Sequence, residues 1–418
     1  MAKNKYFFPI IMVTSLFFMW GFVHNLDPIL IPHLKKSFSL TNLQSSLVDS
    51  SVFIAYLLMA LPAGYLMKRY GYKAGIITGL LLFALGSFLF IPAANTQLYE
   101  FFLAALFIIA CGLTILETTA NPYVSLLGDP ATATRRLNFA QSFNGLAATL
   151  APIIGARIIL TKGYPEEELN VMSESARQVA LASEASSVKG PYLILGSIIL
   201  LVALIFYFVR LPEIEESTEK TESKNAFHAL RHKHLSWAVA AQFFYVGAQV
   251  CVFSFFILYA VDVAGLDRVL AADYLGWGCG LAFMIGRFFG VFLMRFILPE
   301  RLLALYSLIC IILCLVAVLA SGMPAVYSVI GIAFFMSVMF PTIFSLGIKG
   351  LGRDTKFGSS LIVMSILGGA VLPPIFAYIG DITRDIRYGH LVSLFCFIVV
   401  LVFALRGHKI IKSPEVYG

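Results

Sequence analysis

The chain has 418 residues, of which 59% are hydrophobic and 13% are charged, and its formal net charge is +7. Because soluble domains have about 25% charged residues, this composition excludes a soluble globular protein and indicates one that crosses a lipid bilayer many times. A spanning helix needs about 20 apolar residues, so roughly twelve spans with short loops fit this length. No basic cluster has interleaved aromatic residues, so we expect no nucleic-acid partner and assign the positive charge to cytoplasmic loops.

Apolar runs predict an all-α membrane protein with twelve transmembrane helices in two six-helix halves. The predicted spans are 8–31, 44–67, 74–93, 99–126, 138–161, 191–210, 236–261, 270–294, 302–321, 325–348, 359–380 and 390–406. The halves comprise residues 1–210 and 236–418, and the polar segment 211–235 joins them as a cytoplasmic linker. A short extra helix is expected near 171–182. The first run is span-length and no small-residue cleavage site ends it, so we interpret it as a helix and not as a signal peptide.

The distribution of Lys and Arg predicts the orientation. With the amino terminus placed in the cytoplasm, the inner segments hold twenty of the 30 Lys and Arg residues, the outer segments eight, and the spans two. Because positive residues concentrate in cytoplasmic loops, we expect both termini in the cytoplasm.

Cysteine and histidine patterns do not suggest a metal site, a cofactor or an enzyme. All six cysteines fall inside apolar runs, and none pairs with a histidine at metal-ligand spacing, so we expect neither disulfides nor a metal. His24 is the one deep histidine, and it has no serine partner for a triad that the sequence can place. No glycine loop with a Lys could cradle phosphates, so the sequence does not support ATP-driven pumping.

Similar stretches recur at matching places in the two halves. Pro122–Gly128 ends the fourth predicted span, and Pro341–Gly347 ends the tenth with Pro, Leu and Gly in register. Gly64–Lys73 follows the second span, and Gly290–Arg295 occupies the corresponding place after the eighth. Two six-helix halves repeated in parallel are typical of secondary transporters.

Glu117 lies deep in the fourth predicted span. An acid such as Asp at this depth costs roughly 2.5–3.5 kcal/mol on insertion scales, so it usually faces a partner or a water-filled cavity. Asn121 follows four residues later on the same helical face. Glu117 could therefore bond only a neighbouring helix, or it could bind substrate and exchange a proton.

Three further predicted spans have polar or aromatic side chains at helical spacing. They are Trp20, His24, Asn25 and Asp27 in the first, Asn138, Gln141 and Asn144 in the fifth, and Gln242, Tyr245 and Gln249 in the seventh. A single amide in a membrane helix often only bonds another helix, whereas several converging faces favour a wet central cavity. Amides suit sugar hydroxyls, and a flat aromatic such as Trp20 or Tyr245 suits the apolar face of a sugar ring. Arg287 is a charged side chain within the eighth predicted span, and we expect it to bond carbonyls or an acid.

Five sequence blocks carry a family resemblance. They are Tyr72–Leu80, Leu116–Tyr123, Arg136–Asn144, Tyr245–Gln249, and Pro341–Lys349 together with Asp354–Ser360. From about Phe17 to about Phe403 the chain resembles the fucose–galactose–glucose:proton symporter family of the major facilitator superfamily. The resemblance implies alternating access, an inner-membrane location and proton-coupled uptake of a monosaccharide. It also implies that Glu117 takes part in sugar binding and proton coupling, and that Asn25, Gln141 and Asn144 line the sugar site.

The first predicted span departs from the family's pattern. The family motif resembles Asn-Leu-Asn-Asp, with the last acid implied to carry a proton, whereas this chain has Asn25-Leu-Asp-Pro28. Asp27 stands two residues from Asn25, roughly 200° around a helix, and so points to another side. Asp49 replaces a residue that is usually glutamine in the family. We therefore expect Glu117 to be the principal titrating group, with Asp27 or Asp49 in the missing role.

The sequence leaves the coupling ion and the sugar open. The alternatives to proton symport of L-fucose or a related hexose are a facilitative or sodium-coupled carrier of glucose, galactose or N-acetylhexosamine, and a sugar receptor that does not transport. A receptor would need a soluble signalling domain, and the linker of about 25 residues is too short for one. We expect a monomer in the bilayer, because each chain contains both halves of its own site.

Overall fold

The computed structural model describes residues 6–24, 42–96, 98–159, 171–212 and 226–410, and all the regular elements in these ranges are helical. The amino-terminal half consists of α1 (Phe7–His24), α3 (Asn42–Thr96), α4 (Tyr99–Leu126), α5 (Ala133–Ile159) and α8 (Lys189–Phe208). A short helix, α7 (Glu174–Ser186), precedes α8 and lies close to the range predicted for it.

The carboxy-terminal half begins with η4 (Ala226–Arg231) and contains six spans, most of which are interrupted. They are α9 (Lys233–Ser254) with α10 (Phe256–Ala264); α11 (Arg268–Asp273), the π-helical η5 (Tyr274–Gly280) and α12 (Leu281–Leu293); α13 (Pro299–Leu319); α14 (Met323–Met336) with α15 (Met339–Gly347); α16 (Thr355–Met364), η7 (Ser365–Leu367) and α17 (Gly368–Thr383); and α18 (His390–Val402) with η9 (Phe403–Gly407). Short 3-10 turns, η2 (Pro130–Thr132), η6 (Gly352–Asp354) and η8 (Ile386–Gly389), lie in the connections.

The described helices form twelve spans, as the sequence predicts. Ten described helical segments are long and apolar enough to cross a membrane. One of them, α3, covers two predicted spans, because the chain turns at Gly71, where φ is 81° and ψ is 175°. The twelfth span is α5, which is not among the ten.

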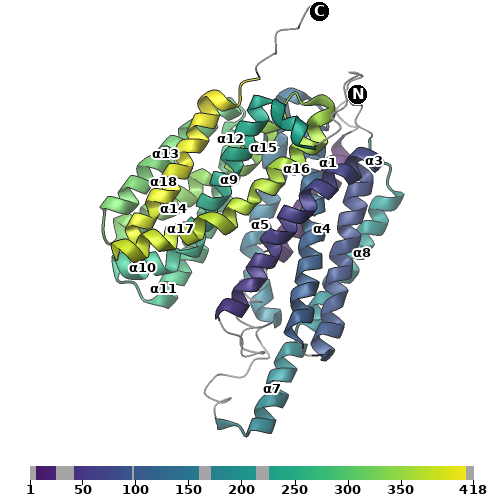
Figure 1. The fold of residues 1–418 in the computed structure, drawn as a ribbon, viewed down its shortest axis with the longest axis vertical. Helices are drawn as coiled ribbons and strands as arrows, with labels where there is room; N and C mark the ends of the chain where they lie inside the picture. The colour runs from purple at the N-terminus through teal and green to yellow at the C-terminus, as the bar shows by residue number, and fades with distance from the viewer. Residues whose placement is uncertain (1–5, 25–41, 97, 160–170, 213–225, 411–418) are drawn as a thin grey trace, which may run out of the picture.

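The two halves form separate lobes that meet at one end. Figure 1 shows the purple-to-teal helices of the first half on one side and the green-to-yellow helices of the second half on the other, with the start of α1 and the end of η9 at the same end of the molecule. At this end α16 packs on α3 and α4, and α5 packs on α12 and α15. The fifth span of each half therefore contacts the opposite half.

Small residues let α3 and α4 approach closely. A Cβ atom on Gly112 would lie 2.6 Å from the backbone nitrogen of Phe83 and 2.7 Å from the carbonyl oxygen of Gly79. Such close approach through small residues is how membrane helices gain packing energy, since apolar side chains gain nothing by leaving lipid for another helix.

We predict that Gly112→Ala destabilises the protein by about 1–3 kcal/mol, because the added methyl group would push against backbone atoms that cannot turn aside. Thermal unfolding in detergent, followed by size-exclusion chromatography, measures the effect. Gly190→Ala on α8 is the control, since nothing lies within 4 Å of the position of its Cβ. Equal melting temperatures for the two variants would contradict the packing argument.

Candidate functional site

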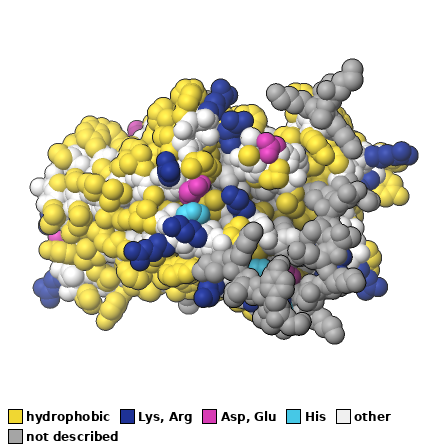
Figure 2. Space-filling view, turned by 90° about the horizontal axis from the view of Figure 1, so that it is seen from above, with side chains coloured by type: hydrophobic (Ala, Val, Ile, Leu, Met, Phe, Trp, Pro, Cys, Tyr) yellow, Lys and Arg dark blue, Asp and Glu magenta, His cyan; other side chains and the backbone are white. Residues whose placement is uncertain are grey.

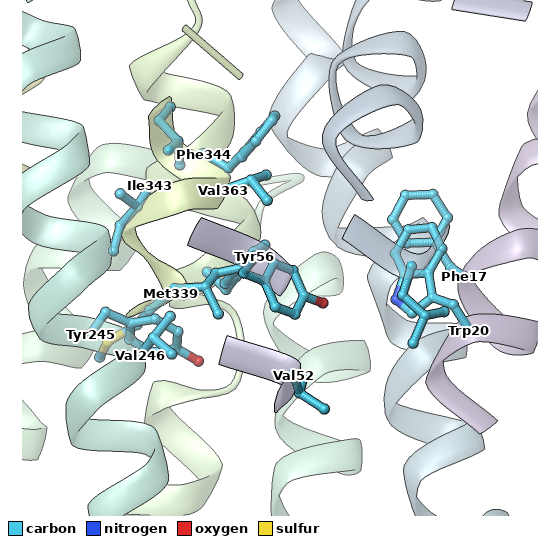
Figure 3. Close-up of a cluster of buried hydrophobic side chains, with 14 of the residues drawn as sticks. Phe17, Trp20, Val52, Tyr56, Tyr245, Val246, Met339, Ile343, Phe344 and Val363 are labelled. Atoms are coloured by element: carbon cyan, nitrogen blue, oxygen red, sulfur yellow. The ribbon is translucent and has the colours of Figure 1, made fainter. Parts of the chain in front are cut away.

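Glu117 faces the interior of the protein. Its side chain on α4 is 8% exposed, and Oε2 accepts a hydrogen bond of 2.7 Å from the hydroxyl of Tyr56 on α3. Figure 3 shows the Tyr56 hydroxyl directed away from Tyr245 and Met339 and toward the side of α1 on which Phe17 and Trp20 lie. Tyr56 was not singled out from the sequence, because one tyrosine in an apolar run has no pattern that distinguishes it.

A second polar contact joins α4 to α5. The amide nitrogen Nε2 of Gln141 donates to Oδ1 of Asn121 at 3.0 Å, and both side chains are buried. The other amide atom of Asn121, Nδ2, is buried and has no hydrogen-bond partner among the described residues. Glu117 and Asn121 lie one turn apart and their side chains interact, so together with Tyr56 and Gln141 they form a polar cluster across three helices.

The first helix contacts α5 one residue after Trp20. Trp20 is buried and packs on Phe17, with ring centroids 4.2 Å apart. One residue later, a Cβ on Gly21 would lie 2.7 Å from Nδ2 of Asn144, so α1 and α5 touch at the half-buried Asn144. His24 ends α1 and is exposed.

Several predicted residues cannot be placed. Asn25 and Asp27 lie outside the described residues, and Asp49 belongs to α3 but its side chain is not described. Their predicted roles therefore stay predictions.

The predicted residues of α9 are enclosed in the second half. Tyr245 is fully buried, and its hydroxyl donates to the carbonyl oxygen of Met336 at 3.1 Å. Gln242 is also fully buried, and neither atom of its amide has a partner among the described residues. Gln249 is half-buried. The structure thus holds the Tyr245 ring inside its own half, and leaves Gln242 with unused hydrogen-bonding capacity.

One face of α5 forms a seam with the second half, which we call the α5 seam: Thr134, Asn138, Gln141 and Gly145. Thr134 Oγ1 and Ser345 Oγ are 2.9 Å apart, and Asn138 Nδ2 donates to Thr342 Oγ1 at 3.1 Å. Steps of four, three and four residues place the seam on one face. Of the polar residues predicted to share a cavity-facing side of α5, Asn138 instead bonds the opposite half.

A corresponding seam runs along the start of α16. Ser359 donates to the carbonyl oxygen of Thr118 at 2.6 Å. The ammonium group of Lys68 lies 5.4 Å from the ring centroid of Phe357, and that of Lys356 lies 5.4 Å from the ring of Tyr72. These contacts join α16 to α3 and α4, as the repeat of the two halves requires.

Arg287 crosses between the halves. It is 5% exposed; Nε donates to the carbonyl oxygen of Ser337 at 3.1 Å, and Nη1 donates to the carbonyl oxygen of Gln141 on α5. The guanidinium carbon lies 4.6 Å from the ring centroid of Phe283. The prediction that Arg287 bonds carbonyls is confirmed.

The arrangement of two six-helix halves matches that of known transporters. A sequence model of the Major Facilitator Superfamily matches residues 10–356. The chain belongs to the Major Facilitator Superfamily. As a member, it is a multi-pass inner-membrane transporter and not an enzyme.

Relatives with related names cover nearly the whole chain. It is 42% identical to the "L-fucose-proton symporter" of Escherichia coli, over 96% of this chain and 93% of that protein. It is 40% identical to the "Glucose/galactose transporter" of Brucella abortus, over 98% and 96%. A crystal structure of the superfamily transporter FucP "in the outward conformation" has a TM-score of 0.90 to this chain at 41% identity, covering 97% of this chain and 99% of that one.

We predict that Asn121 and Gln141 stabilise the protein together. A double-mutant cycle with Asn121→Ala and Gln141→Ala should give a coupling free energy of about 0.6 kcal/mol, the average for hydrogen bonds between membrane helices. Unfolding in mixed micelles measures it. The control pair is Asn121→Ala with Ser142→Ala, since Ser142 bonds the carbonyl of Asn138 in its own helix. A cycle that closes additively for the first pair would refute the link.

Proposed function

We propose that the protein imports a neutral monosaccharide, L-fucose or a related hexose, together with protons by alternating access. The observation that carries the proposal is the buried carboxyl of Glu117 within a polar cluster in the membrane-spanning region. The names of the relatives in Escherichia coli and Brucella abortus support the sugar and the proton.

Glu117 suits proton exchange because it can be paired in either charge state. Removal from water disfavours a charged carboxylate, so a proton arriving with the sugar has a ready acceptor. The Tyr56 hydroxyl donates to Glu117 in this structure. A hydroxyl also accepts, so the same contact can persist when the carboxyl carries a proton. The contact between Tyr56 and Glu117 can therefore persist when the charge of the carboxyl changes.

The sugar is proposed to bind beside this cluster. The first half supplies Trp20, His24, Asn25, Glu117, Asn121, Gln141 and Asn144, and the second half supplies Gln242, Tyr245 and Gln249. The unused amide of Gln242 favours this assignment, since a sugar hydroxyl can both donate and accept. Tyr245 would take part after the second half rearranges, and Asp27 or Asp49 would be the second proton carrier.

The orientation follows from charge, with both termini in the cytoplasm. Figure 2 looks onto the end of the molecule where the chain termini lie, and Lys and Arg side chains are spread over its described surface. Such an excess is the mark of a cytoplasmic face. The α5 and α16 seams then lie toward the cytoplasm, so the sugar would arrive from the opposite side. The protein is proposed to work as a monomer.

Replacing Glu117 tests the proton coupling. We predict that Glu117→Gln lowers sugar accumulation driven by an inward proton gradient by about tenfold or more, because the amide cannot take up the proton that the carboxylate accepts. A tenfold loss corresponds to about 1.4 kcal/mol. Labelled L-fucose uptake into proteoliposomes is the measurement, with Glu100→Gln, an exposed acid on the same helix, as the control. Wild-type accumulation by Glu117→Gln would overturn the role of this acid.

The alternative is a facilitative or sodium-coupled carrier, which Pro28 leaves open because it stands where the family has an acid. Sugar added to de-energised cells should raise the pH of the medium if protons enter with it, and a pH electrode records this. The same assay on Asp27→Asn and Asp49→Asn identifies the second proton carrier. The variant that lacks this acid should lose most of the alkalinisation. No pH change with wild-type protein, combined with sugar uptake that needs sodium or no ion gradient, would favour the alternative. A competition panel of fucose, galactose, glucose, mannose and N-acetylglucosamine identifies the sugar.

A further inference from the structure

Arg287 has an unusual position for a charged side chain. It lies in α12, is 5% exposed, and makes no ion pair within the described part of the chain. A buried cation without a carboxylate is costly in a membrane, where ionisable groups generally mark a functional path. Its hydrogen bonds go instead to two carbonyl oxygens, one in each half.

The contact within its own half is firm. Ser337 lies at the break between α14 and α15, where a carbonyl oxygen is available to a side chain. The neighbouring Gly286 packs α12 on the same break, because its Cβ would lie 2.3 Å from the carbonyl oxygen of Phe334. The guanidinium plane is further held by Phe283. Arg287 is therefore anchored to the second half.

The contact with the first half is narrow. Arg287 reaches a single carbonyl, that of Gln141, on the helix turn that also bonds Asn121. Gly145 allows the approach, since its Cβ would lie 3.2 Å from Cδ of Arg287. The guanidinium thus ends the α5 seam beside the polar cluster of Glu117.

Few other charges act on Arg287. The Glu117 carboxylate attracts its guanidinium, and the Tyr245 phenol is the other titratable group that interacts with it. Among the described side chains of the elements packed against α12, α5 brings Arg135 and Arg136 near its start, η5 brings Tyr274, and α14 brings Tyr327. Glu117, on α4, is the acid that acts on Arg287 among the described residues.

We propose that Arg287 is a positioning residue that keeps the cytoplasmic side closed while Glu117 is charged and releases it when Glu117 is neutralised. This inference rests on the proposed function. With Glu117 charged, attraction adds to the one hydrogen bond that Arg287 makes to the first half, so a sugar bound without a proton cannot open the cytoplasmic side. With Glu117 protonated, that hydrogen bond alone remains. The same attraction draws the empty carrier back after release.

Transport measurements separate this role from a structural one. Arg287→Gln should lower proton-driven accumulation roughly tenfold, within the range of coupling between two sites. At alkaline pH on both sides, the same variant should raise downhill sugar flux about threefold, a change within the same range of coupling, because sugar can then cross without a proton. Arg287→Lys keeps the charge, so its accumulation and its downhill flux should lie between those of wild type and those of Arg287→Gln. Arg295→Gln, which removes an exposed arginine just after α12, is the control and should behave as wild type.

A distance measurement tests this closing role of Arg287, which we call the latch, without relying on activity. Spin labels at Tyr70→Cys and Lys349→Cys, both exposed and on opposite halves, report the separation at the cytoplasmic end, and the six native cysteines are buried. Arg287→Gln should lengthen the distance at alkaline pH, where wild type stays short, and Glu117→Gln should do the same. A wild-type distance in Arg287→Gln, or loss of downhill flux together with accumulation at every pH, would overturn the latch. Should wild type itself fail to couple sugar to protons while the distances still respond, the proposed function fails and the latch stands.

Discussion

A carboxyl group held out of water constrains this molecule more than any other single feature. The bilayer offers no solvent to Glu117, so neighbouring helices must supply its partners. Tyr56 does so from α3, and Asn121 and Gln141 continue the polar cluster from α4 to α5. Each of these helices must therefore reach the same depth and turn the same side inward, which fixes how the first half can pack.

The contacts between the halves follow from the internal repeat. The fifth span of the first half, α5, contacts α12 and α15, and the fifth span of the second half, which begins with α16, contacts α3 and α4. Both seams consist mainly of small side chains, single hydrogen bonds and cation–ring contacts. Such contacts are individually weak, so they can break and re-form as a carrier changes shape. A large apolar interface between the halves would not allow this.

Much of the fold could be predicted from the sequence, because the thickness of the bilayer sets the length of the apolar runs and positive residues concentrate in cytoplasmic loops. The shared face of Glu117 and Asn121 also followed from helical spacing. The contacts with Tyr56 and Gln141 did not, because a partner contributed by another helix depends on tertiary packing. The same reason explains Asn138: its side chain was expected to face a cavity with that of Gln141, yet it bonds Thr342 in the other half.

The helices of the two halves differ in continuity. In the first half α1, α4, α5 and α8 run unbroken, whereas in the second half the chain is interrupted at Phe255, between Met336 and Met339, and again at η7. These interruptions give the second half defined points at which its spans can bend. The half that contains Glu117 can then stay the more rigid of the two while the other half changes shape around it.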